Sequence, residues 1–592
     1  MGLLSKIAIS LVVLYIASFV FIKVFNPPAP NRKLFPSTSS TPYESNKFQP
    51  KDEHRFANPS LAYKVLTQLD VFTPVDERHY LVPGGTAKQV NGTFLGLKSD
   101  DHYCEKHRAY FCEASAYFFN KMNIIFEVGR NAESVPRVKA IAGTGHDIMP
   151  NVGGHMPANI KNSSTIDIKP DVNMYFTAVS TYIKKELGKH FSCLTQSSNH
   201  IPGNRILSRK DFVAQASIEY GNKWENKPQC FTYDKFFPRT WLLTNKTDCE
   251  AFFAQINSAQ YQKDKAERTI VYMRKTGVGA HRGQGVQPVN DEEEAELRKM
   301  YANGKKCGNV KKNYIIQHYI YNPLLLQSHK FDFRMYMLVA STNPFMAYYH
   351  DGFLRVSLVD YDVNSNDKKS LLTNLVLSEG IYEDVRKGAL YQGMDEEDLR
   401  VAQQWSFERL HNYLMESGVV TDPNWLDNYL RPEFKKAMIH LVRLAKDNML
   451  RDSTVYELYG VDFMLDTNLN LWFIEANAGP AFDGYSKPME KFITKMLADH
   501  FEIIHGLLKS RMQRIIKYVN GVINDGSLIQ DSENKNVIIK DLETKRTEFK
   551  KVIENGFEPE FEPKATNGFS KFMDEHFEGT DMYLGLVPQD CL

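Results

Sequence analysis

The stretch YELYGVDFMLDTNLNLWFIEANAGP occupies residues 456–480 and contains two alternating apolar runs on either side of a polar segment. This pattern predicts a β-hairpin. A tight turn centred between Asn468 and Leu469 would place Asp462 directly opposite Glu475 on the neighbouring strand. Asn477 lies two residues beyond Glu475 and would project from the same face. The hairpin is therefore expected to bring two carboxylates and one amide oxygen together.

Two interpretations of this polar cluster are open. A surface hairpin with a solvated polar face is common and needs no ligand. Against it, Trp472 and Phe473 help to make both faces largely apolar, so the carboxylates would be poorly solvated without a partner. Carboxylate and amide oxygens suit Mg²⁺, which usually keeps water ligands and shares its shell with substrate phosphates. The second interpretation makes Asp462, Glu475 and Asn477 a candidate magnesium site.

Length and composition set the limits for the rest of the chain. At 592 residues it exceeds one ordinary core, so two domains, or one large domain with additions, are expected. A hydrophobic content of 43% and a charged content of 24% are typical of a folded protein. The formal net charge of +1 argues against a general nucleic-acid binder, and we predict no nucleic-acid partner.

The N-terminus departs from this composition. Residues 3–25 are apolar apart from Lys6, Lys23 and a few small polar residues, which is long enough for one membrane span with lysines at its two ends. We predict an uncleaved membrane anchor; a signal peptide is the alternative, although its apolar region is normally shorter. Basic residues lie on both sides, so the positive-inside rule does not decide the orientation.

Sequons and cysteines are relevant to the question of which side of the membrane the rest of the chain lies on. Sequons at Asn91, Asn162 and Asn245 would permit glycosylation in a lumen. Six of the seven cysteines could form three disulfides there, and Cys104 and Cys112 are close enough in sequence to pair. In the cytosol the same cysteines would be reduced, buried thiols. The sequence leaves both placements open.

A lysine and a dense run of glycines precede the hairpin. In residues 269–289, TIVYMRKTGVGAHRGQGVQPV, a β-rich segment carries Lys275 and leads into closely spaced glycines. Such glycines let backbone amides approach an anion, and a lysine on a strand can contact phosphate oxygens. A flexible hairpin tip is the alternative.

Charged residues then alternate along a predicted strand. In KFDFRMYMLVAS, residues 330–341, Lys330, Asp332 and Arg334 are separated by apolar residues and therefore share one face. A following strand, after an expected Asp-Gly turn, adds Arg355. Beside the glycine loop these strands would form the cationic pocket that a polyphosphate needs, whereas a solvated edge strand is the alternative.

In their order along the chain, these blocks resemble the tubulin tyrosine ligase-like family of ATP-grasp ligases. The resemblance covers about residues 166–510 and also rests on NHIPG (199–203), RKD (209–211), FFPRTW (236–241), IIQHYIYNPLLL (315–326), GFLRVS (352–357) and LLTN (371–374). It implies an α+β ATP-grasp fold with ATP held between two lobes. It also implies a reaction in which ATP phosphorylates a carboxylate and an amine attacks the acyl phosphate.

The resemblance implies ATP and Mg²⁺ as cofactors, a free amino acid (glutamate, glycine or tyrosine) as donor, and a protein acceptor such as tubulin. By position, the implied catalytic residues are Arg334 and Arg355, and the implied metal ligands are Asp462, Glu475 and Asn477. The implied nucleotide-binding residues are Lys275, Gly283, Gly285, Gln317, His318, Tyr319, Ile320, Lys330, Asp332 and Asn374. The chain departs from the family at Lys275-Thr276, where Lys-Pro is usual, and in its expected membrane anchor.

These features predict five segments along the chain: an anchor (1–25), a Pro- and Ser-rich stem (26–60), an extension without an assigned role (61–165), the ATP-grasp domain (166–510), and a C-terminal helix with an acidic tail (511–592) that is either extended or a loosely packed appendage. The leading hypothesis is a membrane-anchored ligase of the tubulin polyglutamylase, glycylase or tyrosine-ligase type. The alternatives are a lumenal ATP-grasp ligase with a non-tubulin acceptor and a catalytically silent ATP-grasp binding protein.

Overall fold

The computed structural model describes residues 54–69, 79–80, 88–89, 101–120, 122–126, 147–149, 174–176, 195–231, 233–277, 285–365, 367–373, 382–482, 484–530, 536–554 and 561–592. These residues belong to one compact unit, Asp52–Leu592. The predicted membrane anchor and most of the predicted stem lie outside them. Within the ranges just given, no helix is both long enough and apolar enough to cross a membrane.

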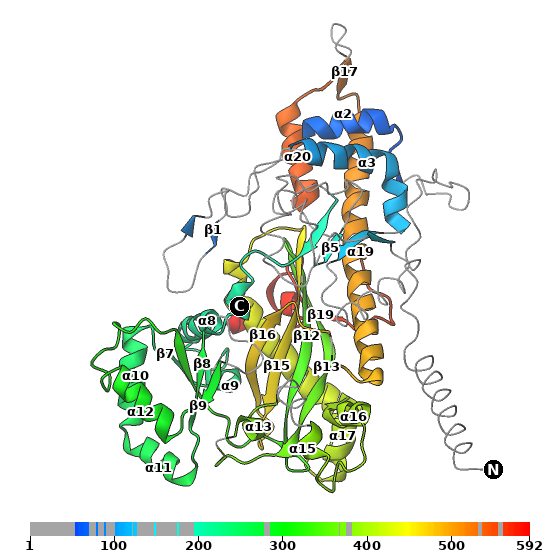
Figure 1. Cartoon of the computed structure of the whole chain (residues 1–592). Helices are drawn as coiled ribbons and strands as arrows, with labels where there is room; N and C mark the ends of the chain where they lie inside the picture. Colours follow the sequence, from blue (N-terminus) through cyan, green and yellow to red (C-terminus); the bar gives the residue numbers. More distant parts are fainter. Residues whose placement is uncertain are drawn as a thin grey trace, which may run out of the picture. The chain divides into compact units, whose positions relative to one another are not determined.

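The described chain has a mixed α+β fold with two principal sheets, which confirms the predicted class (Figure 1). The smaller sheet is antiparallel, with the strand order β7-β10-β8-β9. Its strands are β7 (Thr240–Leu242), β8 (Tyr272–Thr276), β9 (Val286–Pro288) and β10 (Tyr314–His318). Its covering helices are α10 (Lys246–Ile256), α11 (Ala259–Glu267) and α12 (Asp291–Met300) on one face, and α8 (Lys210–Lys223) on the other.

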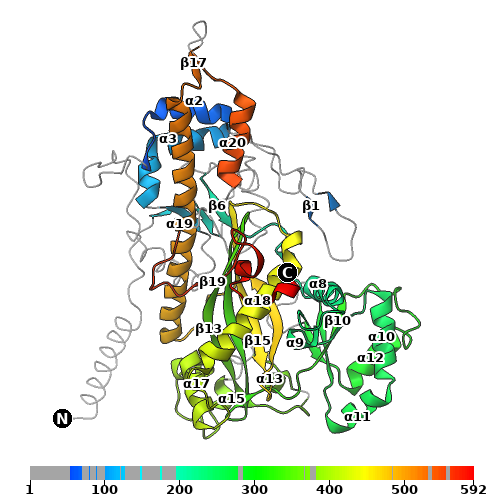
Figure 2. The ribbon, with the colours of Figure 1, turned by 180° about the vertical axis from the view of Figure 1, so that it is seen from behind.

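The larger sheet has eleven strands among the described residues, and its centre is antiparallel. The central strands are β12 (His329–Thr342), β13 (Phe345–Asp360), β15 (Val455–Leu465) and β16 (Leu471–Ala478). Every residue of β12 is buried, so its charged face is not a solvated edge. From behind, α18 (Arg431–Ala445) lies across this sheet, where Phe434 packs edge-on against Phe333 and Phe463 (Figure 2).

The remaining elements are short. The other strands of the larger sheet are β3 (Asn123–Phe126), β4 (Asp147–Met149), β5 (Met174–Phe176), β6 (Ser197–Asn199), β11 (Leu325–Leu326), β14 (Gln404–Trp405) and β19 (Ser570–Asp574). Two strand pairs stand apart, β1 (His79–Tyr80) with β2 (Lys88–Gln89) and β17 (Leu528–Gln530) with β18 (Val537–Ile539). The short helices are α7 (Arg205–Ser208), α9 (Tyr233–Phe236), α13 (Lys368–Leu371), α15 (Tyr382–Val385), α16 (Glu396–Gln403), α17 (Phe407–Glu416), η5 (Leu426–Leu430), η6 (Lys446–Asn448), η7 (Gly579–Tyr583) and η8 (Gln589–Cys591).

The predicted hairpin is present as β15 and β16, and Asp462 pairs with Glu475 as expected. The route to that pairing differs from the prediction. From Leu465 opposite Leu471 back to Phe463 opposite Phe473, the register is that of a turn centred on Asn468. Ile474 then forms a bulge, and this extra residue restores the pairing of Asp462 with Glu475.

The Asp-Gly turn expected before Arg355 is wrong. β13 is continuous, and Asp351 and Gly352 form an irregularity within it, opposite the step from Arg334 to Tyr336 on β12. A Cβ on Gly352 would collide with the carbonyl of Arg334, so the position requires glycine for close backbone approach. The chain reverses instead at residues 343–344, between the C-terminal end of β12 and the N-terminal end of β13.

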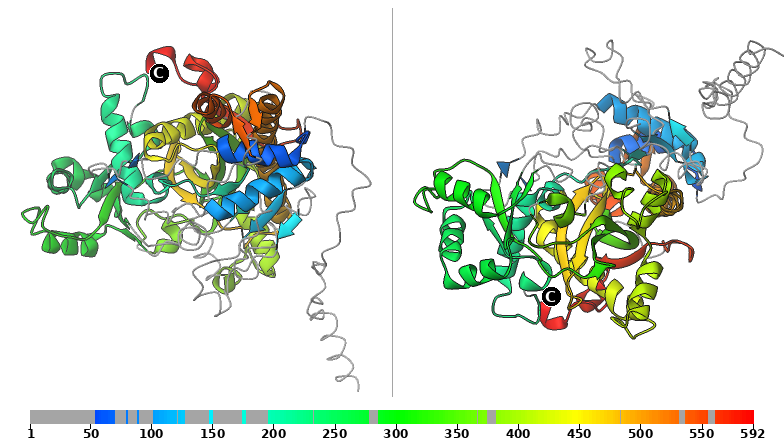
Figure 3. Two further views of the ribbon diagram at one scale, coloured as in Figure 1. Left: turned by 90° about the horizontal axis from the view of Figure 1, so that it is seen from above. Right: turned by 60° about the horizontal axis from the view of Figure 1, so that its bottom comes forward.

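The longest helix, α19 (Lys487–Asn524), connects the end of the hairpin with the N-terminal part of the fold. It packs against α2 (Pro59–Leu69), α3 (Asp101–Asn120) and α20 (Leu542–Glu554), which gather beside it (Figure 3). The helix continues without interruption through Gly506, where the absence of a Cβ makes room for the ring of Phe561. The helix also crosses the expected boundary at residues 510 and 511.

The C-terminal segment 561–592 is not the extended tail that its acidic composition suggested. Its strand β19 pairs with β13, and Cys591 forms a disulfide with Cys230. A second disulfide joins Cys249 to Cys307. Cys112 is a buried free thiol, so it does not pair with Cys104.

Candidate functional site

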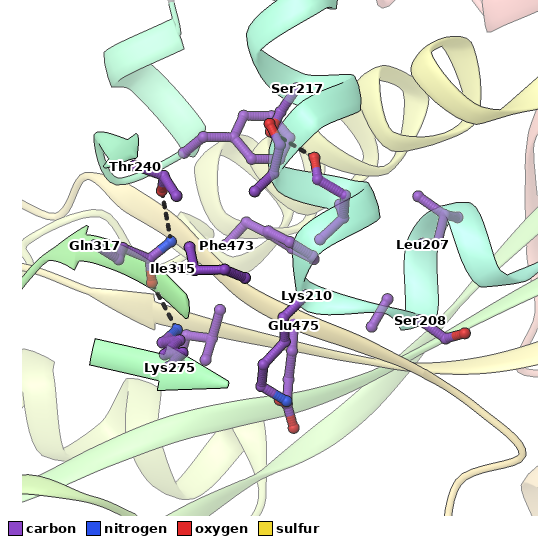
Figure 4. A pocket seen from close by; sticks show the side chains of 15 residues that line it. Leu207, Ser208, Lys210, Ser217, Thr240, Lys275, Ile315, Gln317, Phe473 and Glu475 are labelled. Carbon is purple, nitrogen blue, oxygen red and sulfur yellow. Dashed lines mark hydrogen bonds and ion pairs between the residues drawn. The ribbon is translucent and has the colours of Figure 1, made fainter. Parts of the chain in front are cut away.

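Two lysines from different sheets point into the predicted nucleotide site. On the smaller sheet, the Nζ of Lys275 donates to Oε1 of Gln317 at 2.6 Å, and Nε2 of Gln317 donates to Thr240 at 3.1 Å (Figure 4). On the larger sheet, the Nζ of Lys330 donates to the Tyr319 hydroxyl and to the Leu371 carbonyl, each at 3.0 Å. The neutral partners hold both ammonium groups without neutralising them.

Burial changes the protonation of these lysines. It lowers the pKa of Lys275 to about 8, with repulsion from Lys210 in the same direction and attraction to Glu475 opposing it. It lowers the pKa of Lys330 to about 7, which Asp332 opposes and Lys275 reinforces. Burial disfavours the charged form of both lysines, so a bound polyanion that restores their charge would be strongly stabilised there.

Arginines and aspartates alternate across three neighbouring strands. Arg355 on β13 binds Asp332 on β12 through two contacts of 2.7 Å, and its Nη2 reaches Asp462 on β15 at 2.8 Å. Arg334 on β12 binds the same Asp462 through contacts of 2.6 and 3.1 Å. The cross-strand register places Asp332 opposite Arg355 and Arg334 opposite Asp462, so the sheet itself positions the array.

The array depends on all its members because it is buried. Burial raises the pKa of Asp332 and Asp462 adds to this, while Arg355 and the Thr373 hydroxyl stabilise the ionised form. The Thr373 Oγ1 donates to Asp332 at 2.5 Å. Removal of Arg355 would leave the buried carboxylate of Asp332 without its cationic partner, which is strongly unfavourable, whereas Asp462 would keep one arginine if either was removed.

One predicted metal ligand, Asp462, belongs to this array, where both of its oxygens accept from arginines, and the other two lie on the neighbouring strand β16. Asn477 donates to Oε1 of Glu475 at 3.2 Å, so both side chains share one face as expected, and Asp462 is the strand partner of Glu475. The described residues contain no cluster of three or more His, Cys, Asp or Glu side chains suited to a metal, and this set has two carboxylates and an amide. Its oxygen-only chemistry fits Mg²⁺ held jointly with phosphates.

Lys210 is a site residue that the sequence did not predict. Its Nζ lies 2.7 Å from Oε2 of Glu475, and Figure 4 shows the two side chains meeting at the pocket. Burial would raise the pKa of Glu475, but the charge and hydrogen bond of Lys210, together with Asn477, outweigh it and lower the pKa to about 2. The only sequence signal is the RKD block, which gives no indication of a contact with the distant hairpin.

The pocket beside this ion pair is a small hollow, with a volume of about 30 Å³, that opens to solvent. It lies where α8, the smaller sheet and β16 meet (Figure 4). Lys275, Gln317 and Glu475 provide its polar wall, while Phe473 and Ile315 belong to its apolar wall. Apolar side chains therefore line one side of the hollow, and the lysine and the carboxylate line the other.

One glycine fixes the path of Arg334. A Cβ on Gly460 would lie 3.1 Å from Cδ and 3.3 Å from Nε of Arg334, and 2.9 Å from the Cβ of Pro480. Nearby, Gln404 accepts from the backbone N–H of Ser486 and donates to the Gly484 carbonyl. Gln404 therefore ties the loop that follows β16 to β14, the strand that pairs with Arg355.

The other predicted nucleotide-binding residues are less informative. His318 ends β10, and its backbone N–H donates to the Arg239 carbonyl, while Ile320 is buried. The Gly285 carbonyl accepts from the N–H of Thr276 at 2.9 Å. Gly283 and Asn374 lie outside the described residues.

Comparison with known proteins identifies the family. A model of the tubulin-tyrosine ligase family matches residues 188–514. The chain is 27% identical over 324 residues to human inactive polyglycylase TTLL10, covering 52% of this chain and 44% of the relative. It is 27% identical over 285 residues to protein polyglycylase TTLL10 of Macaca fascicularis (46% and 42%), and 25% identical over 324 residues to tubulin polyglutamylase TTLL5 of Mus musculus (54% and 22%).

The matched part of the chain thus spans less than half the length of each of these relatives. The family match itself covers more than half of the chain and contains all the predicted site residues. It confirms the resemblance that the order of the sequence blocks indicated. The chain belongs to the tubulin-tyrosine ligase family.

Proposed function

We propose that this protein is an ATP- and Mg²⁺-dependent ligase that joins an amino acid to a carboxylate of a protein acceptor through an acyl phosphate. The observation that carries the proposal is the buried array in which Arg334 and Arg355 converge on Asp332 and Asp462 beside two lysines of lowered pKa. Buried charge at this density is costly unless a charged ligand uses it.

Each group has a role in such a reaction. Lys275 and Lys330 would hold the phosphates, and the two arginines would neutralise the charge between the transferred phosphoryl group and the reacting carboxylate. Asp462, Glu475 and Asn477 would hold Mg²⁺, which supplies further neutralisation of phosphate charge when bound. The chain's own contribution is to fix these groups on rigid strands, and the reaction requires no nucleophilic side chain.

The names of the relatives support glycine or glutamate as the donor, because they include polyglycylases and a tubulin polyglutamylase. One relative is named an inactive polyglycylase, which favours a second candidate, a nucleotide-binding protein without ligase activity. The two candidates differ in turnover, since both would bind ATP but only a ligase would form a new amide bond.

The test is incubation of the purified full chain with ATP, Mg²⁺ and labelled glycine, glutamate or tyrosine over a panel of acceptors that includes tubulin. A ligase transfers label only when ATP is present. Glu475→Gln keeps the shape of the side chain but removes its charge, so we expect incorporation to fall by about 10²–10³-fold in a protein that remains folded.

The matched control is Glu296→Gln, which changes an exposed carboxylate on α12. It should retain full activity. Undiminished incorporation by Glu475→Gln would refute the metal assignment. ATP binding without incorporation into any acceptor of the panel would favour the silent protein.

A further inference from the structure

The smaller sheet displays a glycosylation sequon on its outer side. Asn245, Lys246 and Thr247 are all exposed at the point where β7 ends and α10 begins. Asn245 caps the helix through its side-chain oxygen, which accepts from the N–H of Asp248 at 3.2 Å. The amide nitrogen, to which a glycan is attached, is the other atom of the same side chain.

The helix that starts at this sequon also contains half of a disulfide. Cys249 is fully buried and bonded to Cys307, with a Cα–Cα distance of 5.7 Å. The second disulfide joins Cys230 to Cys591 with a Cα–Cα distance of 5.1 Å, across 361 residues of sequence. Both distances lie within the usual range for a disulfide.

Disulfides of this kind form and persist in oxidising compartments and are rare in the cytosol. The Cys230–Cys591 pair is also structural, because it fixes the C-terminal segment to the part of the chain that follows α8. Neither pair includes a residue of the proposed ATP site. A redox role in catalysis therefore does not explain them, whereas a folding environment that oxidises thiols does.

We propose that the described body of this protein folds in the oxidising lumen of the secretory pathway and that Asn245 carries an N-linked glycan there. The apolar residues 3–25 would direct the chain into that pathway. Each disulfide forms as two thiols lose two protons and two electrons to an oxidised disulfide oxidoreductase, which is reduced to its dithiol.

The glycosylation step is a substitution at an activated sugar. The Asn245 amide nitrogen forms a bond to C1 of a lipid-linked oligosaccharide diphosphate and loses a proton, while the bond from C1 to the phosphate oxygen breaks and the lipid diphosphate leaves. The glycan would extend from the outer edge of the smaller sheet, beside α10 (Figure 1). Asn245 is not among the residues of the proposed ATP site.

This placement narrows the class of acceptor, a step that rests on the proposed ligase function. A ligase in the lumen would meet secretory and membrane proteins rather than cytosolic tubulin. Its acceptor would be a carboxylate on the lumenal part of such a protein.

The test uses the full chain expressed in a eukaryotic cell line. After treatment with peptide N-glycosidase, Asn245 should be converted to aspartate, as detected by mass spectrometry in isotopically labelled water. Thr247→Ala removes the sequon but keeps the capping Asn245, and it should migrate one glycan faster on a gel. Thr247→Ser keeps the sequon and should migrate like the wild type.

Alkylation of thiols before and after reduction tests whether the two disulfides form. Peptides linked through Cys249 and Cys307, and through Cys230 and Cys591, should appear only in unreduced digests. Unmodified Asn245 in the wild type, or alkylation of these four cysteines before reduction, would overturn the proposal. These measurements need neither ATP nor an acceptor, so a failure of the proposed ligase function would not affect them.

Discussion

Lys330 is a charged residue that the fold removes almost completely from water. It is 3% exposed, and its ammonium group also lies over the ring of Tyr319. A pKa of about 7 leaves it largely neutral at pH 8 in the free protein. Polyphosphate bound nearby would raise that pKa again, because opposite charge favours the ionised form.

We therefore predict that ADP binding at pH 8 takes up more than one proton, about 0.9 at Lys330 and up to about 0.5 at Lys275, and that affinity declines as the pH rises above about 7. The sign follows from a pKa that is low in the free protein and raised in the complex. Calorimetry in two buffers of different ionisation enthalpy measures the uptake. Lys330→Arg retains the charge without titrating in this range, so it should bind ADP with a clearly smaller uptake; equal uptake would contradict the assignment.

Lys210 is the cation that pairs with Glu475, one of the proposed metal ligands. Because it neutralises Glu475 in the free protein, it competes with a divalent cation for the same carboxylate. Lys210→Met should therefore bind Mn²⁺ more tightly in the absence of nucleotide, by about tenfold, which corresponds to roughly 1.4 kcal/mol. Paramagnetic resonance of free Mn²⁺ provides the measurement.

The matched control is Lys223→Met, at the exposed end of the same helix. It should leave Mn²⁺ binding unchanged. If Lys210→Met bound Mn²⁺ as the wild type does, the ion pair would have no connection with the metal site.

The hairpin of β15 and β16 shows how an element can be predicted correctly for an incomplete reason. The alternating pattern was enough to place Asp462 opposite Glu475 and to put Asn477 on the face of Glu475. The bulge at Ile474 could not be predicted, because it depends on how the strand packs rather than on its own pattern. The turn is centred half a residue before the expected position, and the extra residue in the bulge restores the predicted pairing.

In the β12–β13 pair, by contrast, one part of the prediction is wrong. The period of two correctly placed Lys330, Asp332 and Arg334 on one face, but the Asp-Gly dipeptide was interpreted as a turn. Its local preference for turns is real. In the folded sheet the dominant constraint is the close approach of Gly352 to the carbonyl of Arg334, which only the neighbouring strand reveals.

Gly460 on β15 permits a prediction about the whole array. In Gly460→Ala the new methyl group would press on Arg334 and Pro480, which should lower the free energy of unfolding by about 1–3 kcal/mol. Because Arg334 would move away from Asp462, ligase activity should fall further than the loss of folded protein explains. Urea unfolding and incorporation assays on the same sample separate the two effects.

Gly521→Ala on α19 is the control, since no atom lies near its added Cβ. Alanine in that helix should be neutral or stabilising by up to about 1 kcal/mol. Full activity in Gly460→Ala would mean that Arg334 adapts without consequence.

At the scale of the whole molecule, contacts distant in sequence were the least predictable. The site residues on strands could be found from periodicity and from the order of the family blocks. Lys210 and Thr373, however, contact Glu475 and Asp332, which are distant in sequence, and no local sequence pattern predicts such contacts. The same reason explains the C-terminal segment. Its acidic composition suggested a tail, whereas pairing with β13 and the bond to Cys230 are decided by tertiary structure.

The NHIPG block also makes a distant contact, through Glu457 on β15. This carboxylate is fully buried and accepts from Nδ1 of His200 at 2.8 Å, from the N–H of Ile201 at 2.9 Å and from Asn204 at 2.8 Å. The donors precede Glu457 by more than 250 residues. β6, which leads into the block, likewise pairs with β15.

This contact determines when the block can fold during synthesis. At translation rates of about 5–20 residues per second, the NHIPG segment leaves the ribosome roughly 10–50 s before its partner strand. Over that interval Glu457, the native acceptor for its polar groups, is absent, and the larger sheet lacks β15 and β16. The nascent chain therefore stays incompletely folded for most of its synthesis. We expect chaperones to bind the NHIPG segment before β15 emerges from the ribosome.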